Sequence, residues 1–329
     1  MEDERIFVVE GCVMAINQVQ FQKGLSMVEF VERYGTEAQC HAALAASRWP
    51  QGFRCPACSD PRHSTFIRED RRYWQCHRCR YQTTVTAGTI FAATKLPLSR
   101  WFLAMHLLTQ AKNNVSALEL KRHLGVRYKS AWLIKHKLLQ VMVEREQRRV
   151  LDGRVEVDDA YLGGERAGKA GRGSENKIPF VVAVQTTDDG HPLLARLDRL
   201  PFTKEAIAGW ANQALAASAR VVSDRLNCFD GLQGNVAAHQ AIKVGSGRQS
   251  VEHPQLRRVN TVLSNLKTAI SGTYHHFDFA KYADRYLAEV QYRFNRRFDL
   301  SSILIRLMRA TVLTRPRPES AIRLAEVRG

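Results

Sequence analysis

The chain has 329 residues, of which 45% are hydrophobic and 25% charged, as is typical of proteins that bury hydrophobic cores. Its length fits two or three domains at about 150 residues each. Lys and Arg number 49 against 32 Asp and Glu, a formal net charge of +17 that predicts a polyanionic partner, most commonly nucleic acid. No run approaches the ~18 apolar residues of a spanning helix, so an integral membrane protein is excluded. An anionic membrane surface is the alternative partner.

The N-terminus is acidic where the n-region of a secretory signal would be basic, so we expect no signal peptide. Met14 is an alternative start, which would make residues 1–13 upstream read-through. Seven cysteines without an export signal favour reduced thiols over a disulfide framework. We therefore expect a cytoplasmic protein.

The first expected element is an N-terminal helical segment within residues 1–48. Residues 15–48 carry apolar side chains at helical spacing, with Gly35 as a break. Residues 49–90 are rich in Cys, Arg, His and aromatic residues and show little apolar periodicity. We therefore expect a second domain to begin near residue 49.

Two cysteine pairs dominate this second domain. They follow the pattern C-x2-C-x17-C-x2-C and consist of Cys55, Cys58, Cys76 and Cys79. Each pair can chelate a metal from a tight turn, and a hairpin between the pairs would bring them together in a tetrahedron. The spacing predicts a zinc ribbon with one structural Zn²⁺.

Basic and aromatic residues alternate along the expected ribbon. This mixture on a small rigid scaffold suits contact with a nucleic-acid backbone, and Arg72 and Arg78 are candidate DNA ligands. Trp74 is expected to pack the small core as well.

Residues 91–150 form a basic helical segment. From Lys95 to Arg149 there are twelve Lys and Arg but three Glu, and the sequence indicates a helix, a turn at Gly125 and a second helix. This is typical of a DNA-binding helix-turn-helix, and a solvated hairpin linking two domains is the alternative. The residues expected to face inward are Leu118, Leu120, Leu124, Ala131, Trp132 and Leu139. Those left for a DNA groove or phosphates are Lys129, Lys135, His136 and Lys137.

The pattern changes to strands after Gly153. VEVDDAYLG alternates with period two, IPFVVAVQTT is β-branched and LLARLDRL follows a turn, so the three predict a meander. A helix capped by Thr203 follows, then the strand ARVVSD, a further strand at AHQAIKV, and helices over residues 255–270 and 279–298. The Pro- and Arg-rich end of a basic C-terminal tail, residues 301–329, is expected to be loosely attached.

Two of these strands are expected to end in a carboxylate. Asp158 follows Val155 and Val157, which form the inward face, and Asp224 follows VVS. Adjacent strands would place these like charges within a few Å, which is unfavourable unless cations neutralise them. Magnesium held in this way performs in-line phosphoryl displacement. The alternative is structural: Asp158 or Asp159 begins a turn, and Asp224 caps a helix.

A glycine-rich stretch begins at Gly163. GGERAGKA nearly matches the phosphate loop G-x4-G-K-[ST], but Ala170 lacks the hydroxyl that would hold magnesium. We therefore discount nucleotide hydrolysis and expect a mobile basic loop beside a cleft that handles DNA.

Several stretches together resemble the transposases of bacterial insertion sequences, specifically insertion-sequence family fifteen-ninety-five. They are FQKGLSMVEFVERYGTEAQCHAAL, RWPQGFRCPAC, VEVDDAYLGGE, VVSD, VNTVLSNLKTAISGTYHHF and RYLAEVQYRFNRR, and they span residues 21–300 in order. The resemblance implies a zinc ribbon followed by a ribonuclease-H-like DDE-type catalytic domain over residues 151–300, an α/β core with a mixed sheet. It places the first catalytic acid at Asp158 rather than Asp159, and the second at Asp224.

The resemblance also implies a third catalytic residue. Aligning Lys267 and Gly272 with the family's Lys and Gly puts Asn260 where relatives carry Glu or Asn. Asn260 is seven residues before Lys267, so the two share a helix face, whereas the rival Asn265 does not. Glu252 is a poor candidate because His253 and Pro254 follow it. We expect Asn260 to ligate magnesium with Asp158 and Asp224, and Lys267 to contact phosphate.

Together with the basic charge and the acidic strand ends, the resemblance implies a bacterial, nucleoid-associated DNA transposase. It would bind terminal inverted repeats, cleave the DNA strand and join the 3′-hydroxyl end to target DNA with two Mg²⁺ ions, Mn²⁺ being an alternative. We expect double-stranded DNA as partner, no membrane, and a homo-oligomer in the synaptic complex. The alternatives are a non-catalytic zinc-ribbon DNA-binding protein derived from a decayed transposase, and a structure-selective nuclease of the same fold.

Overall fold

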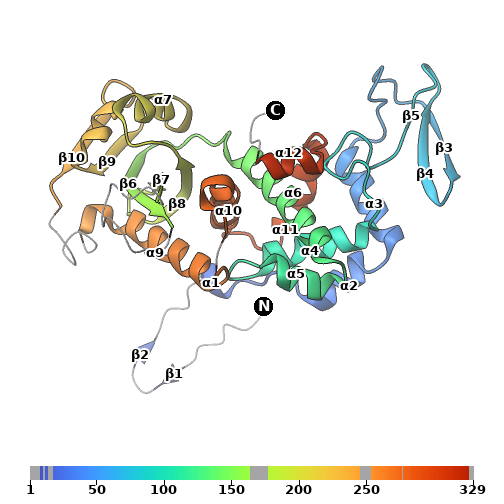
Figure 1. Cartoon of the computed structure of the whole chain (residues 1–329), viewed down its shortest axis with the longest axis horizontal. Helices are drawn as coiled ribbons and strands as arrows, with labels where there is room; N and C mark the ends of the chain where they lie inside the picture. Colours follow the sequence, from blue (N-terminus) through green and yellow to red (C-terminus); the bar gives the residue numbers. More distant parts are fainter. Residues whose placement is uncertain are drawn as a thin grey trace.

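The computed structural model describes residues 18–163, 177–244, 253–275 and 277–325, and the backbone of a short hairpin of β1 (Val8–Val9) and β2 (Cys12–Val13). A helical body lies between a three-stranded ribbon on one side and a five-stranded sheet on the other (Figure 1). No helix in the described ranges is long and apolar enough to cross a membrane.

The N-terminal helices form as their capping residues predict. They are α1 (Gln18–Phe21), α2 (Met27–Tyr34) and α3 (Glu37–Arg48). Ser26 and Thr36 each begin a helix with a capping box, in which the hydroxyl accepts a backbone N–H of the first turn. Gly35 ends α2, so the break expected at this residue is confirmed.

The ribbon consists of β3 (His63–Arg68), β4 (Arg71–Cys76) and β5 (Gln82–Thr83), all antiparallel in that order. Its base is held to the body by aromatic packing. The ring centroid of Trp49 lies 5.0 Å from those of both Phe53 and Trp74. Trp74 is buried, as expected, and belongs to the hydrophobic cluster that also contains the helical body.

The basic segment forms α4 (Leu98–Gln110), α5 (Ala117–Leu124) and α6 (Tyr128–Glu146). Gly125 ends α5 in the left-handed region, at φ 62°, so the expected turn between two helices is confirmed. Leu120 and Leu124 are buried, but the expectation that Leu118 faces inward is wrong, because 47% of its surface is exposed. Helix α6 is buried on nearly all sides by α5, α10 and α11.

The sheet contains β6 (Arg154–Leu162), β7 (Ile178–Thr186), β8 (Pro192–Arg199), β9 (Arg220–Asp224) and β10 (Ala238–Ile242). Its order is β10-β9-β6-β7-β8. The strands β6, β7 and β8 form the predicted antiparallel meander, while β9 runs parallel to both β6 and β10. The expected α/β core with a mixed sheet is therefore confirmed.

Helices cover both faces of this sheet. Helix α7 (Lys204–Ala214) and the 3-10 helix η1 (Asn227–Leu232) pack on one face, and Thr203 caps α7 as expected. Helices α9 (Arg257–Ser271) and α10 (Phe279–Phe294) pack on the other, and α9 follows the short 3-10 helix η2 (Pro254–Leu256). Helix α10 also packs against α6, so it joins the sheet to the helical body.

The C-terminal segment is part of the fold. Helix α11 (Ile303–Leu313) packs against α3, α4 and α6, and α12 (Glu319–Leu324) packs against α6. Ile322 is buried, and Arg317 pairs with Glu144 at 2.7 Å. The expectation of a loosely attached tail is therefore wrong over residues 314–325.

Candidate functional site

The sheet brings Asp158 and Asp224 side by side. In the parallel pair of β6 and β9, Val157 is the partner of Ser223, and the next residue of each strand is an aspartate. Because equivalent positions of paired parallel strands face the same way, both carboxylates point to the α9 face. Asp158 does not end its strand as expected. It lies in the middle of β6, which continues to Leu162 by pairing with β7.

A third carboxylate joins these two. Oxygens of Asp158, Asp159 and Asp224 lie within 4.8 Å of one another and could hold a metal ion. The family resemblance places the first acid at Asp158 rather than at Asp159. Successive residues of a strand point to opposite faces, so their spacing alone gave no reason to place both carboxylates at one site.

The electrostatics of this cluster fit a cation site. Burial and the neighbouring carboxylates of Asp224 and Asp159 raise the pKa of Asp158 to about 7, and the positive charge of Lys267 opposes that shift. Three acids in so small a volume repel one another, and a divalent cation would remove that repulsion. The residues present therefore fit the magnesium ions that the sequence analysis expects.

Glu156 connects β6 to the first turn of α9. Its carboxylate accepts the backbone N–H groups of Arg258 and Val259 at 2.8 and 3.0 Å, and it pairs with Arg154 at 2.6 Å. Glu156 is buried and lies on the same face of β6 as Asp158. It therefore fixes the start of α9 next to the acidic cluster. This role was not among the expectations from sequence, although the two-residue spacing from Asp158 indicates a shared face.

The polar residues of α9 lie along the two edges of its buried stripe. Val259, Leu266 and their neighbours face the sheet. At 100° per residue, Asn260 and Lys267 lie on one edge of this stripe and Asn265 on the opposite edge. Lys267 acts electrostatically on Asp158, so its edge is the one that faces the acidic cluster.

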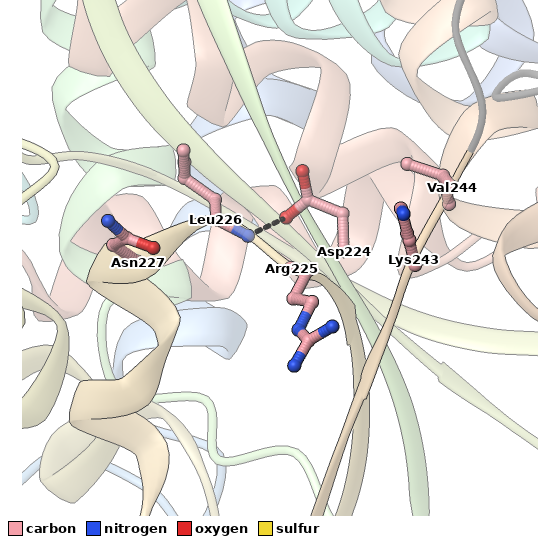
Figure 2. Close-up of a pocket in the computed structure, with 6 residues that line it drawn as sticks. All are labelled: Asp224, Arg225, Leu226, Asn227, Lys243 and Val244. Carbon is pink, nitrogen blue, oxygen red and sulfur yellow. Dashed lines mark hydrogen bonds between the residues drawn. The ribbon is translucent and has the colours of Figure 1, made fainter.

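A cavity of about 390 Å³ opens beside Asp224 (Figure 2). Its lining consists of Asp224, Arg225, Leu226, Asn227, Lys243 and Val244. The backbone N–H of Leu226 donates to the Asp224 carboxylate at 3.3 Å, which orients this side chain. Two exposed cations, Arg225 and Lys243, therefore line the same cavity as Asp224.

Serine and histidine side chains meet on the adjacent strands. The Ser223 hydroxyl lies 2.9 Å from Nε2 of His239, a pair that the sequence analysis did not foresee. Ser223 is fully buried, however, so it is not placed to attack a substrate.

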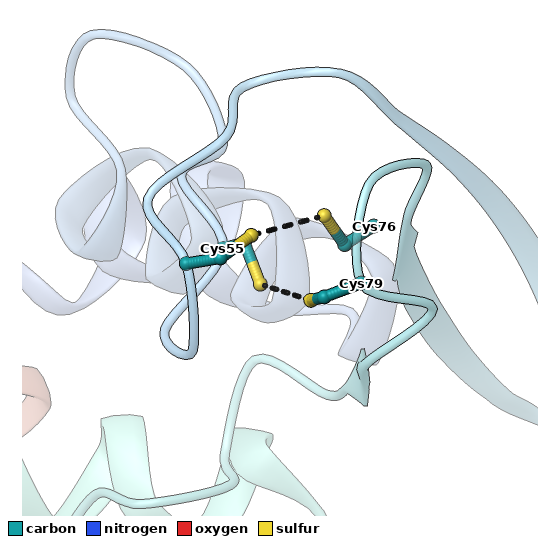
Figure 3. A group of neighbouring side chains, drawn as sticks. Cys55, Cys76 and Cys79 are labelled. Atoms are coloured by element: carbon teal, nitrogen blue, oxygen red, sulfur yellow. Dashed lines mark hydrogen bonds between the residues drawn. The ribbon is translucent and has the colours of Figure 1, made fainter.

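The four cysteines of the ribbon form a second cluster (Figure 3). The Sγ atoms of Cys55 and Cys79 are 3.5 Å apart, and those of Cys58 and Cys76 are 3.6 Å apart. Tetrahedral zinc with bonds of about 2.3 Å to sulfur needs separations close to these. The backbone N–H of Cys79 holds the pKa of the Cys76 thiol below its usual range.

The two halves of the cluster have the same backbone geometry. Ser59 and Arg80, which follow the second cysteine of each pair, both lie in the left-handed region, at φ 60° and 61°. Each donates its N–H to the carbonyl of the first cysteine, at 2.8 and 3.1 Å. The repeated turn therefore aims both pairs at a common centre.

Family models match both clusters. A model for the ISXO2-like transposase domain of IS1595 matches residues 150–295, and a model for the transposase zinc-ribbon domain matches residues 35–82. The chain belongs to the IS1595 family of transposases. The second model contains all four cysteines, which supports structural zinc.

One relative of this IS1595-family chain is an uncharacterized protein in transposable element ISH50 of Halobacterium salinarum. The two are 28% identical over 185 residues, a match that covers 50% of this chain and 61% of the relative. The chain thus spans less than two thirds of that relative's length. Because this relative is archaeal, membership of the IS1595 family does not assign the chain to bacteria.

Two lysines expected to contact DNA lie in the interior of this IS1595-family chain. Lys135 is fully buried, pairs with Glu289 at 3.2 Å and donates to the Tyr274 hydroxyl at 2.5 Å. Lys137 is buried and donates to the carbonyl of Ile90 at 3.3 Å. The expectation that these ammonium groups contact phosphate is therefore wrong.

Of the other residues expected to contact DNA, one is buried and the rest lie on the surface. His136 is fully buried and packs against Trp132, with 4.1 Å between the ring centroids, so its expected place in a DNA groove is wrong as well. Lys129 is exposed and pairs with Glu319 at 3.2 Å. On the ribbon, Arg72 and Arg78 are both exposed. Glu252 and the glycine-rich stretch after Gly163 lie outside the described residues.

Proposed function

We propose that this chain is a DNA transposase that binds the terminal inverted repeats of an insertion sequence, cleaves the DNA strand and joins its 3′-hydroxyl end to target DNA. The observation that carries the proposal is the acidic cluster, in which oxygens of three aspartates lie within 4.8 Å where β6 and β9 run parallel. Family membership adds DNA as the substrate class.

Each residue of the site has a chemical role in this proposal. Asp158 and Asp224 hold the divalent ions, and Asn260 provides a neutral oxygen from the edge of α9. Bound there, two Mg²⁺ or Mn²⁺ ions would supply charge neutralisation and an activated hydroxyl for in-line displacement. Lys267 places a positive charge against the phosphate, and Arg225 and Lys243 extend that charge along the cavity beside Asp224.

Asn260 is favoured over Asn265 as the third ligand by the geometry of α9. Asn260 shares an edge of the helix with Lys267, whose charge acts on Asp158. Glu156 holds the two residues before Asn260 by their backbone N–H groups. The position of Asn260 is therefore coupled to β6, which also carries Asp158.

Transposition requires two element ends to be held together, so we propose a homo-oligomer on DNA. The net charge of +17 supports a large, sequence-independent contribution of phosphate contacts to binding. Exposed arginines of the ribbon, including Arg72 and Arg78, contribute to these contacts.

The test uses the full-length zinc-loaded protein and duplexes taken from the DNA that flanks its reading frame. With Mg²⁺ we expect both cleaved and strand-joined products. Asp158→Asn and Asp224→Asn should abolish both products and leave DNA binding intact. Asp230→Asn is the matched control, because Asp230 is an exposed acid of η1 that pairs with Lys204 at 2.7 Å.

The products also distinguish the alternative functions. Cleavage without joining would identify a structure-selective nuclease. Binding of the end duplexes without any cleavage would identify a non-catalytic DNA-binding protein.

A further inference from the structure

The ribbon carries a hairpin arm, residues 66–73, that extends beyond its third strand. Strand β5 pairs with β4 only at Trp74 and Gln75, so the arm is a two-stranded ribbon without a covering strand. It projects away from the helical body (Figure 1). Its turn is two residues long, and both Glu69 and Asp70 have positive φ, at 50° and 58°. This is the geometry of a type I′ turn, which gives the arm a fixed register.

One face of the arm is a rigid aromatic and cationic surface. Phe66 and Tyr73 are cross-strand partners whose rings stack at 5.3 Å with an interplanar angle of 9°. The guanidinium group of Arg68 lies 4.8 Å from the centre of the Tyr73 ring. Arg71 is the cross-strand partner of Arg68 and extends this face toward the turn.

The other face carries an exposed apolar side chain beside a cation. Ile67 is 68% exposed, and its cross-strand partner is Arg72. Among the described residues no carboxylate forms an ion pair with Arg68, Arg71 or Arg72. A β-branched residue this exposed on a projecting arm gains free energy only when a partner covers it.

We propose that the hairpin arm enters the major groove of duplex DNA and reads its sequence there. This rests on the proposed function and adds to it the surface that selects the element ends. A two-stranded β-ribbon fits the major groove, which is about 12 Å wide. Arginine pairs with guanine in a bidentate manner, and an apolar side chain such as that of Ile67 contacts the thymine methyl group. Three arginines that form no ion pair with a carboxylate in the described part of the chain complement phosphates on either side, which favours DNA over a second copy of this basic chain.

The experiment selects duplexes from a random-sequence library with the full-length zinc-loaded protein. Wild type should enrich a motif, and Arg72→Gln should lower affinity for the enriched duplex about tenfold and remove the preference at one or two positions. Ile67→Thr should weaken a preference for thymine. Arg72→Lys keeps the charge but not the bidentate geometry, so it should lose base preference while its affinity for a scrambled duplex is unchanged.

Matched controls are Ile305→Thr and Arg306→Gln on α11, where Ile305 is 47% exposed. They should leave the motif unchanged. Zinc content and far-UV circular dichroism identify any variant that fails to fold. If another arm variant fails to fold, the base preference of Arg72→Lys, the mildest change, decides whether the proposal stands.

Three results would overturn the proposal: no motif enriched by the wild type, the same motif and affinity for all arm variants, or arm variants that alter only the oligomeric state. Strand cleavage is scored separately on the flanking duplexes. If the wild-type protein does not cleave these duplexes, the proposed function alone is contradicted. If the wild type cleaves them and the arm variants select the same sequences as the wild type, the proposal for the arm alone is contradicted.

Discussion

The carboxylate of Glu156 lies 3.0 Å from the backbone nitrogen of Val259, although the two residues belong to a strand and a helix far apart in the sequence. This contact places the first turn of α9 against β6 beside Asp158. Glu156→Ala would leave one buried and one partly buried N–H group without an acceptor, at a cost of about 1–3 kcal/mol for the buried group and less for the other. We therefore expect the free energy of unfolding to fall by about 2–4 kcal/mol in urea titrations.

A second measurement separates positioning from general stability. If Glu156 holds α9 in place for the metal ions, the rise in melting temperature on adding Mg²⁺ should be smaller in Glu156→Ala, which has no acceptor, than in wild type. Glu205→Ala is the control, because Glu205 is an exposed acid in the first turn of α7. An unchanged Mg²⁺ effect in Glu156→Ala would show that the contact is structural only.

Removal of zinc should unfold the ribbon while the sheet stays folded. Cys79→Ser should abolish stoichiometric zinc, because three thiolates leave the tetrahedron open. Tryptophan fluorescence follows the change, since Trp74 and Trp49 lie 5.0 Å apart at the base of the ribbon. Cys228→Ser should retain one zinc per chain by elemental analysis, because Cys228 is a buried residue of η1 and lies outside the cluster.

Breaking the buried ion pair of Lys135 and Glu289 should lower the free energy of unfolding. Lys135→Met removes the closer of the two cations at the buried Glu289 carboxylate, leaving only Arg293 at 3.8 Å, and should cost about 3–5 kcal/mol of unfolding free energy. The double variant Lys135→Met with Glu289→Leu should recover part of that loss. Lys129→Met should cost less than about 1 kcal/mol, because its pair with Glu319 is exposed to solvent. Equal losses from Lys135→Met and Lys129→Met would contradict this assignment.

Protonation of His136 should destabilise the fold in acid. Burial, and then the charges of Arg285 and Lys135, lower the pKa of His136 to about 2 in the folded chain. The unfolded chain takes up a proton below about pH 6.5, so stability falls as the pH drops through that value. Between pH 7.5 and 5.5 wild type should lose about 1.4 kcal/mol more than His136→Phe. His123→Gln, at an exposed site on α5, should match wild type across this range.

Local patterns predicted the zinc centre and the order of strands and helices. The spacing of the four cysteines is enough to place them around one metal ion. Gly125 and Thr203 cap the ends of helices that adjoin them in the sequence. The proximity of Asp158 and Asp224 could also be predicted, because each follows a run of β-branched residues. The length of β6 could not be predicted, because its pairing with β7 continues past the acids to Leu162.

The lysines of α6 show where a sequence pattern fails. Three consecutive residues, Lys135, His136 and Lys137, spread over about 200° of a helix, so any helix surrounded by partners must bury some of them. The partner of Lys135 is Glu289 on α10, a contact that no local spacing indicates. A cluster of basic residues predicts a charged surface only when the helix has an exposed face.

The third metal ligand gives the most direct test of the site. Asn260 and Asn265 lie on opposite edges of α9, and only the edge of Asn260 carries Lys267, whose charge acts on Asp158. Asn260→Ala should therefore abolish Mg²⁺-dependent cleavage and reduce the Mg²⁺-induced rise in melting temperature, while DNA affinity stays within about twofold. Asn260→Asp adds a negative charge toward the ions and should tighten Mg²⁺ binding. Asn265→Ala is the matched control and should behave as wild type in cleavage, thermal stability and DNA binding. Full activity of Asn260→Ala with loss of activity in Asn265→Ala would mean that the opposite edge of α9 faces the ions, and the assignment of Lys267 to the phosphate would fail with it.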